Sequence, residues 1–158
     1  MKKKVLISAC LLGKNCRYNG GHSKLTELEG IDVEWIPVCP EELGGLGTPR
    51  PSAEMQGSAE AILNGKGKVL TNKGKNITQE FIQGADKSFQ SGLEVEVKTA
   101  ILKSKSPSCG IGKIYDGSFT KKLKTGDGIF AHLCHENDIA CISSDNINRI
   151  KKTLAKLK

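Results

Sequence analysis

The sequence has no apolar run near the roughly 18 residues that a membrane-spanning helix needs, so an integral membrane helix is not expected. It also has no segment typical of a secretory signal. The basic start Lys2–Lys4 is followed only by a short apolar stretch, residues 5–12, which Ser8 interrupts and Gly13 ends. We therefore expect a cytoplasmic protein in a compartment that keeps thiols reduced.

The sequence also lacks internal repeats and low-complexity linkers, and its 158 residues suit one domain spanning residues 1–158. Apolar residues make up 37% and charged residues 26%, as is usual for a globular chain. The net charge is +7, but the excess lies at Lys2–Lys4 and within residues 149–158. Because the stretch between is nearly neutral, charge alone does not indicate a nucleic-acid groove.

Short apolar segments alternate with helical patterns along the chain. Strands are predicted at residues 4–9, 33–38, 97–102 and 139–142. Helices are predicted at residues 78–92, at 128–137 with Asp127 as the cap, and after Ser144 or Asp145. Residues 52–74 fit either short strands or one helical turn. The alternation predicts an α/β fold with an open, mainly parallel sheet.

Six cysteines in a reducing compartment are expected to be thiols, used for metal binding or catalysis rather than for disulfides. Cys10, Cys39 and Cys109 each follow a predicted strand. Ligands of open parallel sheets bind beyond the carboxyl ends of the strands, so these three thiols could converge there. No pair of cysteines has the short spacing of a zinc knuckle or ribbon, which makes a structural zinc site less natural.

The other three cysteines have different surroundings. Cys134 falls in a predicted helix and Cys141 in a buried strand, where free cysteine commonly packs as a small hydrophobe. Cys16 lies in a loop and could be a fourth ligand, a redox partner or only a loop residue. Three ordinary buried thiols remain the alternative for Cys10, Cys39 and Cys109.

Three soft thiolates without a fourth suit an iron–sulfur cluster with one iron left open, which would act as a Lewis acid. Glu41 stands two residues beyond Cys39. A carboxylate beside such a cluster could activate water or shuttle a proton. The alternative for Glu41 is a solvated loop acid.

Five motifs make the chain similar to the thiouracil desulfidase family, over essentially its whole length to about Ile147. They are SACLLG at residues 8–13, RYNGGH at 17–22, PVCPE at 37–41, GTPRP at 47–51 and KSKSPSCG at 103–110. One departure is Asn19, where an aspartate is common in the family pattern.

The resemblance implies a Rossmann-like α/β domain and a [4Fe-4S] cluster held by Cys10, Cys39 and Cys109. It also implies that Glu41 is the acid–base residue and that a serine of the last motif, Ser106 in preference to Ser108, assists catalysis. The implied reaction is a non-redox removal of sulfur from a thiouracil-type base, giving the oxo base and hydrosulfide. A free base or nucleotide is the expected substrate rather than RNA, because some relatives that act on RNA carry an additional domain.

Further residues of these motifs are candidates to bind the substrate, either its base or a phosphate: Arg17, Tyr18, His22, Arg50 and Ser108. The alternative is that they brace the loops. Two other functions compete with the enzyme. One is a zinc-stabilised module that binds nucleic acid through its basic ends. The other is a thiol redox protein that uses Cys10 and Cys16 as a dithiol.

Overall fold

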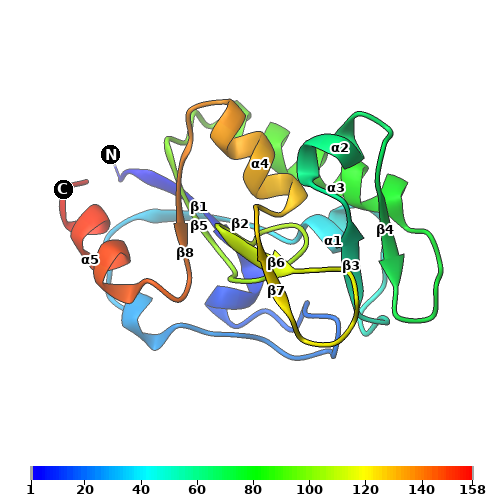
Figure 1. Ribbon diagram of the computed structural model, residues 1–158. Coiled ribbons are helices and arrows are strands. Elements are labelled where there is room, and N and C mark those ends of the chain that lie inside the picture. The colour runs from blue at the N-terminus through cyan, green and yellow to red at the C-terminus, as the bar shows by residue number, and fades with distance from the viewer. Residues whose placement is uncertain (1, 158) are drawn as a thin grey trace.

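The computed structural model describes residues 2–157 and is built on a four-stranded parallel sheet (Figure 1). The strands lie side by side in the order β2 (Glu34–Val38), β1 (Lys4–Ser8), β5 (Thr99–Leu102) and β8 (Ala140–Ser143). All four were predicted from sequence to within two residues at each end. Pro37 lies in β2, an edge strand, where the missing N–H interrupts no inner ladder.

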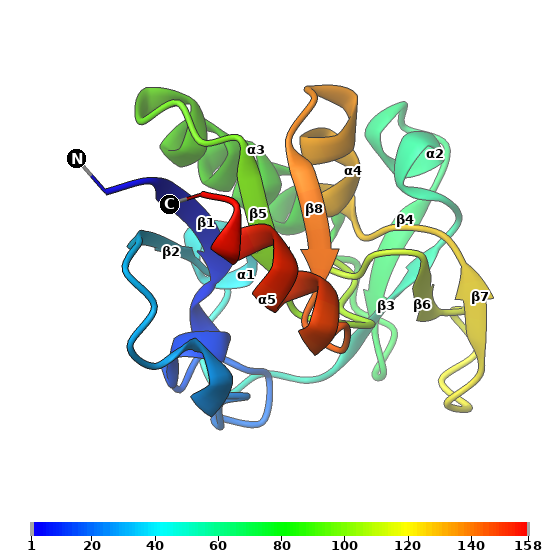
Figure 2. The same ribbon diagram turned by 90° about the vertical axis from the view of Figure 1, so that its left-hand side faces the viewer.

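Helices cover both faces of this sheet, which gives the Rossmann-like α/β architecture that the sequence predicts. Alternate residues of a strand point to opposite faces. Leu6 and Leu102 pack in one core cluster with the helices α3 (Thr78–Glu94) and α4 (Ile129–Glu136). Ile7 and Ile101 pack in a second cluster with α5 (Ile147–Ala155). Figure 2 shows α5 in front of the sheet with α3 and α4 behind it.

Two antiparallel strand pairs lie beside the central sheet (Figure 1). The first joins β3 (Ala53–Gln56) to β4 (Lys68–Thr71) and includes the short helix α2 (Ala59–Leu63) between them. The second joins β6 (Lys113–Tyr115) to β7 (Leu123–Thr125). Residues 52–74 therefore contain both of the structures between which the sequence left a choice. The sequence pattern did not predict β6 and β7, since strands of three residues carry too short a pattern.

The ends of the predicted helices needed correction. Thr78 lies within helix α3 and does not cap it. The Thr78 hydroxyl instead accepts a hydrogen bond from the N–H of Val69 at 3.0 Å. The helix also continues past Gly92 to Glu94. A Cβ at Gly92 would lie 3.1 Å from the Leu6 side chain and 3.0 Å from Val97, so this glycine permits close packing instead of ending the helix.

The predicted caps of the last two helices were wrong. Asp127 does not cap α4: its carboxylate accepts the N–H of Gly112 at 2.8 Å and contacts the His135 ring at 2.7 Å. Helix α5 is capped by Asn146, whose side chain accepts the N–H of Arg149, not by Ser144 or Asp145. Helix α4 starts after Gly128 with no side-chain cap, whereas in α5 the capping Asn146 stands within two residues of both predicted caps.

Three short helical segments complete the part that surrounds the strand ends: η1 (Ala9–Leu12), η2 (Thr26–Leu28) and α1 (Pro40–Leu43). Helix α1 starts directly after β2, with Pro40 in its first turn, where a missing N–H costs no hydrogen bond. No helix within residues 2–157 combines the length and apolar character needed to cross a membrane.

Candidate active site

The carboxyl ends of β1, β2 and β5 border a cavity of about 520 Å³, the place where open α/β sheets bind ligands. Cys10, Cys39 and Cys109 all line this cavity, and all three side chains are buried. Glu41 lines it as well. The structure therefore brings together the three cysteines and the carboxylate that the sequence singled out.

Each of the three thiols is carried by a short turn that follows directly on a strand. Cys10 lies in η1, immediately after β1, and Cys39 joins β2 to α1. Cys109 lies in the loop after β5, which the hydroxyl of Ser106 shapes. This hydroxyl accepts the N–H groups of Ser108 at 3.1 Å and Cys109 at 3.0 Å. Three separate segments of the chain thus hold the sulfur atoms at one edge of the sheet.

The surroundings of Cys39 and Cys109 favour the protonated form of these two thiols as long as no metal is bound. Burial raises the pKa of Cys109 well above its usual value, and the nearby Glu41 carboxylate adds to the rise. A hydrogen bond with Cys16 raises the pKa of Cys39, and burial adds to it. Bound iron would replace these protons, because the thiolate is the form that ligates metals.

The donor set fits a cluster better than a single metal ion. Within residues 2–157, no three His, Cys, Asp or Glu side chains are gathered closely enough to hold one ion. The three thiols instead border a shared cavity. A four-iron cluster is larger than an ion and takes its cysteine ligands from well-separated positions, and soft sulfur donors suit it.

Cys16 is a fourth thiol in the same cavity wall, 2% exposed. A hydrogen bond with the Cys10 thiol is the main cause that raises the pKa of Cys16 to about 11. The Cys16 carbonyl oxygen accepts a hydrogen bond from Nη2 of Arg50 at 3.0 Å and from Sγ of Cys39 at 3.7 Å. Cys16 therefore belongs to the thiol group structurally, although the sequence could not place it.

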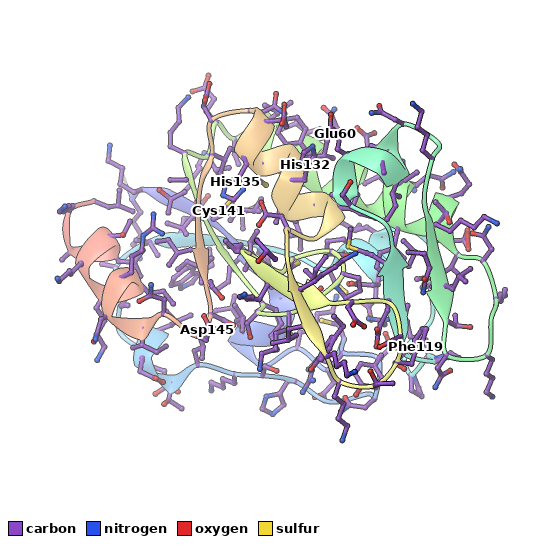
Figure 3. The ribbon with its side chains drawn as sticks, in the orientation of Figure 1. Glu60, Phe119, His132, His135, Cys141 and Asp145 are labelled. Carbon is purple, nitrogen blue, oxygen red and sulfur yellow. The ribbon has the colours of Figure 1, made fainter. Side chains whose placement is uncertain are left out.

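Cys134 and Cys141 lie in the hydrophobic core, as expected. They contact each other, and this hydrogen bond together with burial raises the pKa of Cys134. Figure 3 places Cys141 on the sheet beside α4. Neither side chain lines the cavity.

Glu41 lies in the first turn of α1 with only 12% of its side chain exposed. Its Oε2 atom is 3.6 Å from Sγ of Cys39, which donates to it, and 3.9 Å from Nη2 of Arg50. The alternative of a solvated loop acid is thus at odds with the structure. A carboxylate held beside a thiol and an arginine can take a proton from water within the cavity.

Arg17, Tyr18 and Arg50, three of the candidates for substrate binding, line the cavity. Arg50 is also tied to its own loop, because Nη1 donates to the Gly47 carbonyl at 3.2 Å and to Oγ1 of Thr48 at 3.0 Å. Both interpretations of Arg50, as a brace and as a ligand of the substrate, therefore agree with its contacts.

Two predicted substrate contacts lie elsewhere. His22 is exposed and outside the cavity wall, and its Nδ1 accepts the N–H of Lys24 at 3.1 Å. Ser108 is completely buried outside the wall, and its hydroxyl has no hydrogen-bond partner within the described chain. Their places in the motifs therefore do not correspond to substrate contact, whereas Ser106 does line the cavity.

Several cavity residues were not singled out from sequence. Lys103 follows β5 and lines the wall, and burial lowers its pKa, with the nearby Arg17 adding to the effect. Its position at a strand end within a motif was a usable signal. Glu54 and Phe119 come from β3 and from the β6–β7 turn, and no sequence pattern pointed to them.

Comparisons with known proteins show the family of this chain. A model of the 2-thiouracil desulfurase family matches residues 5–146. The uncharacterized protein YbbK of Bacillus subtilis (strain 168) is 39% identical over 149 residues, which cover 92% of this chain and 99% of YbbK. A solved structure of the [4Fe-4S]-dependent thiouracil desulfidase TudS superimposes with a TM-score of 0.84 at 35% identity, covering 98% of this chain and 99% of that one.

Proposed function

This chain belongs to the 2-thiouracil desulfurase family, and from that premise we propose that it hydrolytically removes sulfur from a thiolated pyrimidine, as free base or nucleotide. The proposal includes a [4Fe-4S] cluster held by Cys10, Cys39 and Cys109, and one domain formed by residues 1–158. The observation that carries it is the cavity at the strand ends, which is lined by three thiols from three loops and by the Glu41 carboxylate.

The reaction exchanges the ring C=S group and water for C=O and hydrosulfide, so no electrons are gained or lost. When bound, the cluster supplies an iron without a protein ligand, a soft Lewis acid that prefers sulfur to oxygen.

Glu41 is the proposed general base. Its carboxylate is mostly shielded from solvent and faces the cavity, so it can accept the proton of the attacking water. Nη2 of Arg50 lies 3.9 Å from Oε2 of Glu41 and helps to hold the orientation of the carboxylate. Because Arg50 is itself fixed to two loop oxygens, the base has a defined position.

Ser106 is proposed to support the reaction through the Cys109 loop. Its oxygen accepts two backbone N–H groups, which leaves its own proton free to be donated. Burial raises the pKa of the Cys109 thiol, and hydrogen bonds from Ser8 and, to a smaller extent, from Ser106 act in the opposite direction. Ser106 therefore stabilises the thiolate form that a cluster needs.

Basic side chains outnumber acidic ones in the cavity wall. Arg17, Lys103 and Lys105 line it together with Tyr18. These donors suit the carbonyl oxygens of a pyrimidine and the phosphate of a nucleotide. We therefore propose Arg17 and Tyr18 as substrate-binding residues, with Lys103 added to those named from sequence.

The test is anaerobic reconstitution with iron and sulfide, followed by metal and sulfide counting and incubation with 2-thiouracil in water labelled with ¹⁸O. The expected result is four irons per chain, released hydrosulfide and uracil that carries the label on the former sulfur-bearing carbon. Turnover that requires a reductant, or zinc as the bound metal with no hydrosulfide released, would contradict the proposal.

A further inference from the structure

The turn between β6 and β7, residues 116–122, presents an aromatic ring to the cavity in an unusual backbone conformation. Phe119 and Lys121 have φ angles of +58° and +64°, and both line the cavity. Bulky residues rarely adopt this left-handed region, because the side chain crowds the backbone. Strain of this kind persists where the surroundings impose it, and it clusters at functional sites.

Hydrogen bonds from the turn to Glu54 in β3 impose this conformation. Oε1 of Glu54 accepts the N–H of Gly117 at 2.9 Å and the N–H of Phe119 at 3.1 Å. Glu54 is buried and lies 63 residues before Gly117 in the chain. Nε2 of Gln56 adds a third bond by donating to the Gly117 carbonyl at 2.8 Å.

Gly117 shows how closely the turn is pressed on β3. It has a φ angle of +94°, and a Cβ there would fall 2.8 Å from the carbonyl oxygen of Met55. The turn is therefore clamped to the strand by backbone contact as well as by the Glu54 carboxylate. Figure 3 shows Phe119 at the β6–β7 turn, beside β3.

The Phe119 side chain is neither buried in the core nor fully exposed to solvent. It is half-buried, and it is absent from both hydrophobic core clusters. Tyr115, at the end of β6, lines the same cavity. An aromatic ring in the wall of a cavity offers a flat surface on which a heterocyclic base can stack.

We propose that Phe119 contacts the face of the pyrimidine ring and determines specificity for it, and that Glu54 is the positioning residue that holds Phe119 in place. The assignment rests on the proposed function for the identity of the ring. Glu54 acts through the two N–H groups of the turn, not by transferring a proton.

The test measures binding of uracil to the anaerobic cluster-loaded enzyme by calorimetry, together with kcat and KM for 2-thiouracil. Phe119→Ala is expected to weaken uracil binding by about five- to a hundredfold, the usual loss for a stacked base. KM should rise in parallel while kcat and iron content stay near those of the unaltered protein. Leu123→Ala is the matched control, since Leu123 is an exposed apolar residue of the neighbouring β7 that does not line the cavity.

A double-mutant cycle separates positioning by Glu54 from direct contact. Glu54→Ala should weaken uracil binding almost as much as Phe119→Ala, and the double variant should lose no more than Phe119→Ala alone. Glu54→Gln should retain most of the affinity, because its amide oxygen can accept the same two N–H groups. Additive losses, or no rescue by glutamine, would show that Glu54 does not act through Phe119.

Equal uracil binding by Phe119→Ala and the unaltered protein would overturn the proposal, as would an unaltered protein that binds no uracil. Failure of the proposed function gives a different result: uracil binds through Phe119, but the loaded enzyme releases no hydrosulfide from 2-thiouracil. The two hypotheses are therefore tested by separate measurements on the same protein.

Discussion

Gly84 of α3 lies directly against the carbonyl oxygen of Pro40 in α1, so that a Cβ at Gly84 would fall 1.8 Å from that oxygen. A second contact of the same kind runs in the other direction: a Cβ at Gly44, at the end of α1, would fall 1.9 Å from the carbonyl oxygen of Glu80 in α3. Two helix backbones thus touch without side chains between them. Since α1 carries Glu41 and begins right after Cys39, this contact sets the position of both site residues.

Gly84→Ala should therefore displace α1 and damage the site as well as the fold. Forcing one methyl group into a closed contact typically costs about 1–3 kcal/mol. We expect a lower melting temperature and a clear loss of bound iron after reconstitution. Gln83→Ala is the matched control, an exposed position in the same helical turn that should change neither value. A Gly84→Ala protein with full stability and iron content would contradict this account of how α1 is held.

The cysteines divide into two groups that reconstitution can distinguish. Cys10→Ala, Cys39→Ala and Cys109→Ala should each lose most of the iron and the visible absorption, because each removes one thiolate ligand. Cys16→Ala should keep the iron, since three other thiols already line the cavity. Iron counting and absorption spectra of the four variants provide the check.

Cys134→Ala is the control for these variants. Cys134 is fully buried in the core and does not line the cavity, so its loss should lower stability by about 1 kcal/mol and leave the iron unchanged. Iron lost equally from Cys134→Ala and Cys10→Ala would mean that unfolding, and not a missing ligand, explains the effect.

The sequence allowed the strand ends to be predicted, and with them the three cysteines that follow the strands. Each of β1, β2 and β5 is a short, largely apolar run that leads into a loop with glycine or proline, and this pattern is local. The residues that follow a buried parallel strand must emerge at one edge of the sheet. That rule predicted that Cys10, Cys39 and Cys109 could converge, and Glu41 was singled out because it stands two residues beyond Cys39.

The remaining part of the site depends on contacts that no local pattern carries. Phe119 reaches the cavity because Glu54, far away in sequence, binds its turn. His22 shares a motif with Arg17, yet its ring turns outward to the backbone of its own loop. Ser108 and Ser106 are two residues apart, but the loop turns only Ser106 toward the cavity. Which neighbour in a motif faces the site is decided by tertiary packing.

Glu42, beside Glu41 in α1, should contribute a pH-dependent part of the stability. Its Oε2 accepts a hydrogen bond from Thr48 at 2.6 Å, and its Oε1 lies 3.1 Å from Nζ of Lys14. The Thr48 hydrogen bond, followed by the Lys14 contacts, lowers the pKa of Glu42. A lowered pKa in the folded state means that the contribution is complete above the usual carboxyl pKa and is lost as pH falls through the lowered one.

Glu42→Gln should thus lower the free energy of unfolding by about 1 kcal/mol near neutral pH. The difference from the unaltered protein should vanish in acid, where both side chains are uncharged. Urea unfolding in steps from about pH 7 to about pH 3 measures this difference. The control Glu29→Gln removes a carboxylate that is 63% exposed and pairs with Lys24, so it should have almost no effect. A Glu42→Gln deficit that is constant over this range would refute the assignment.

Glu41→Gln should nearly abolish turnover while leaving the cluster in place. The amide keeps the size of the side chain but cannot take a proton, and a positioned general base typically contributes about 10²–10⁴-fold in rate. We expect kcat for 2-thiouracil to fall by that factor, with iron content and visible absorption unchanged. Glu42→Gln is the matched control from the next position of the same helix, because Glu42 does not line the cavity and its change should leave kcat within about twofold. A Glu41→Gln enzyme with full activity would show that water is activated by another group, and Glu41 would then be a structural partner of Arg50 alone.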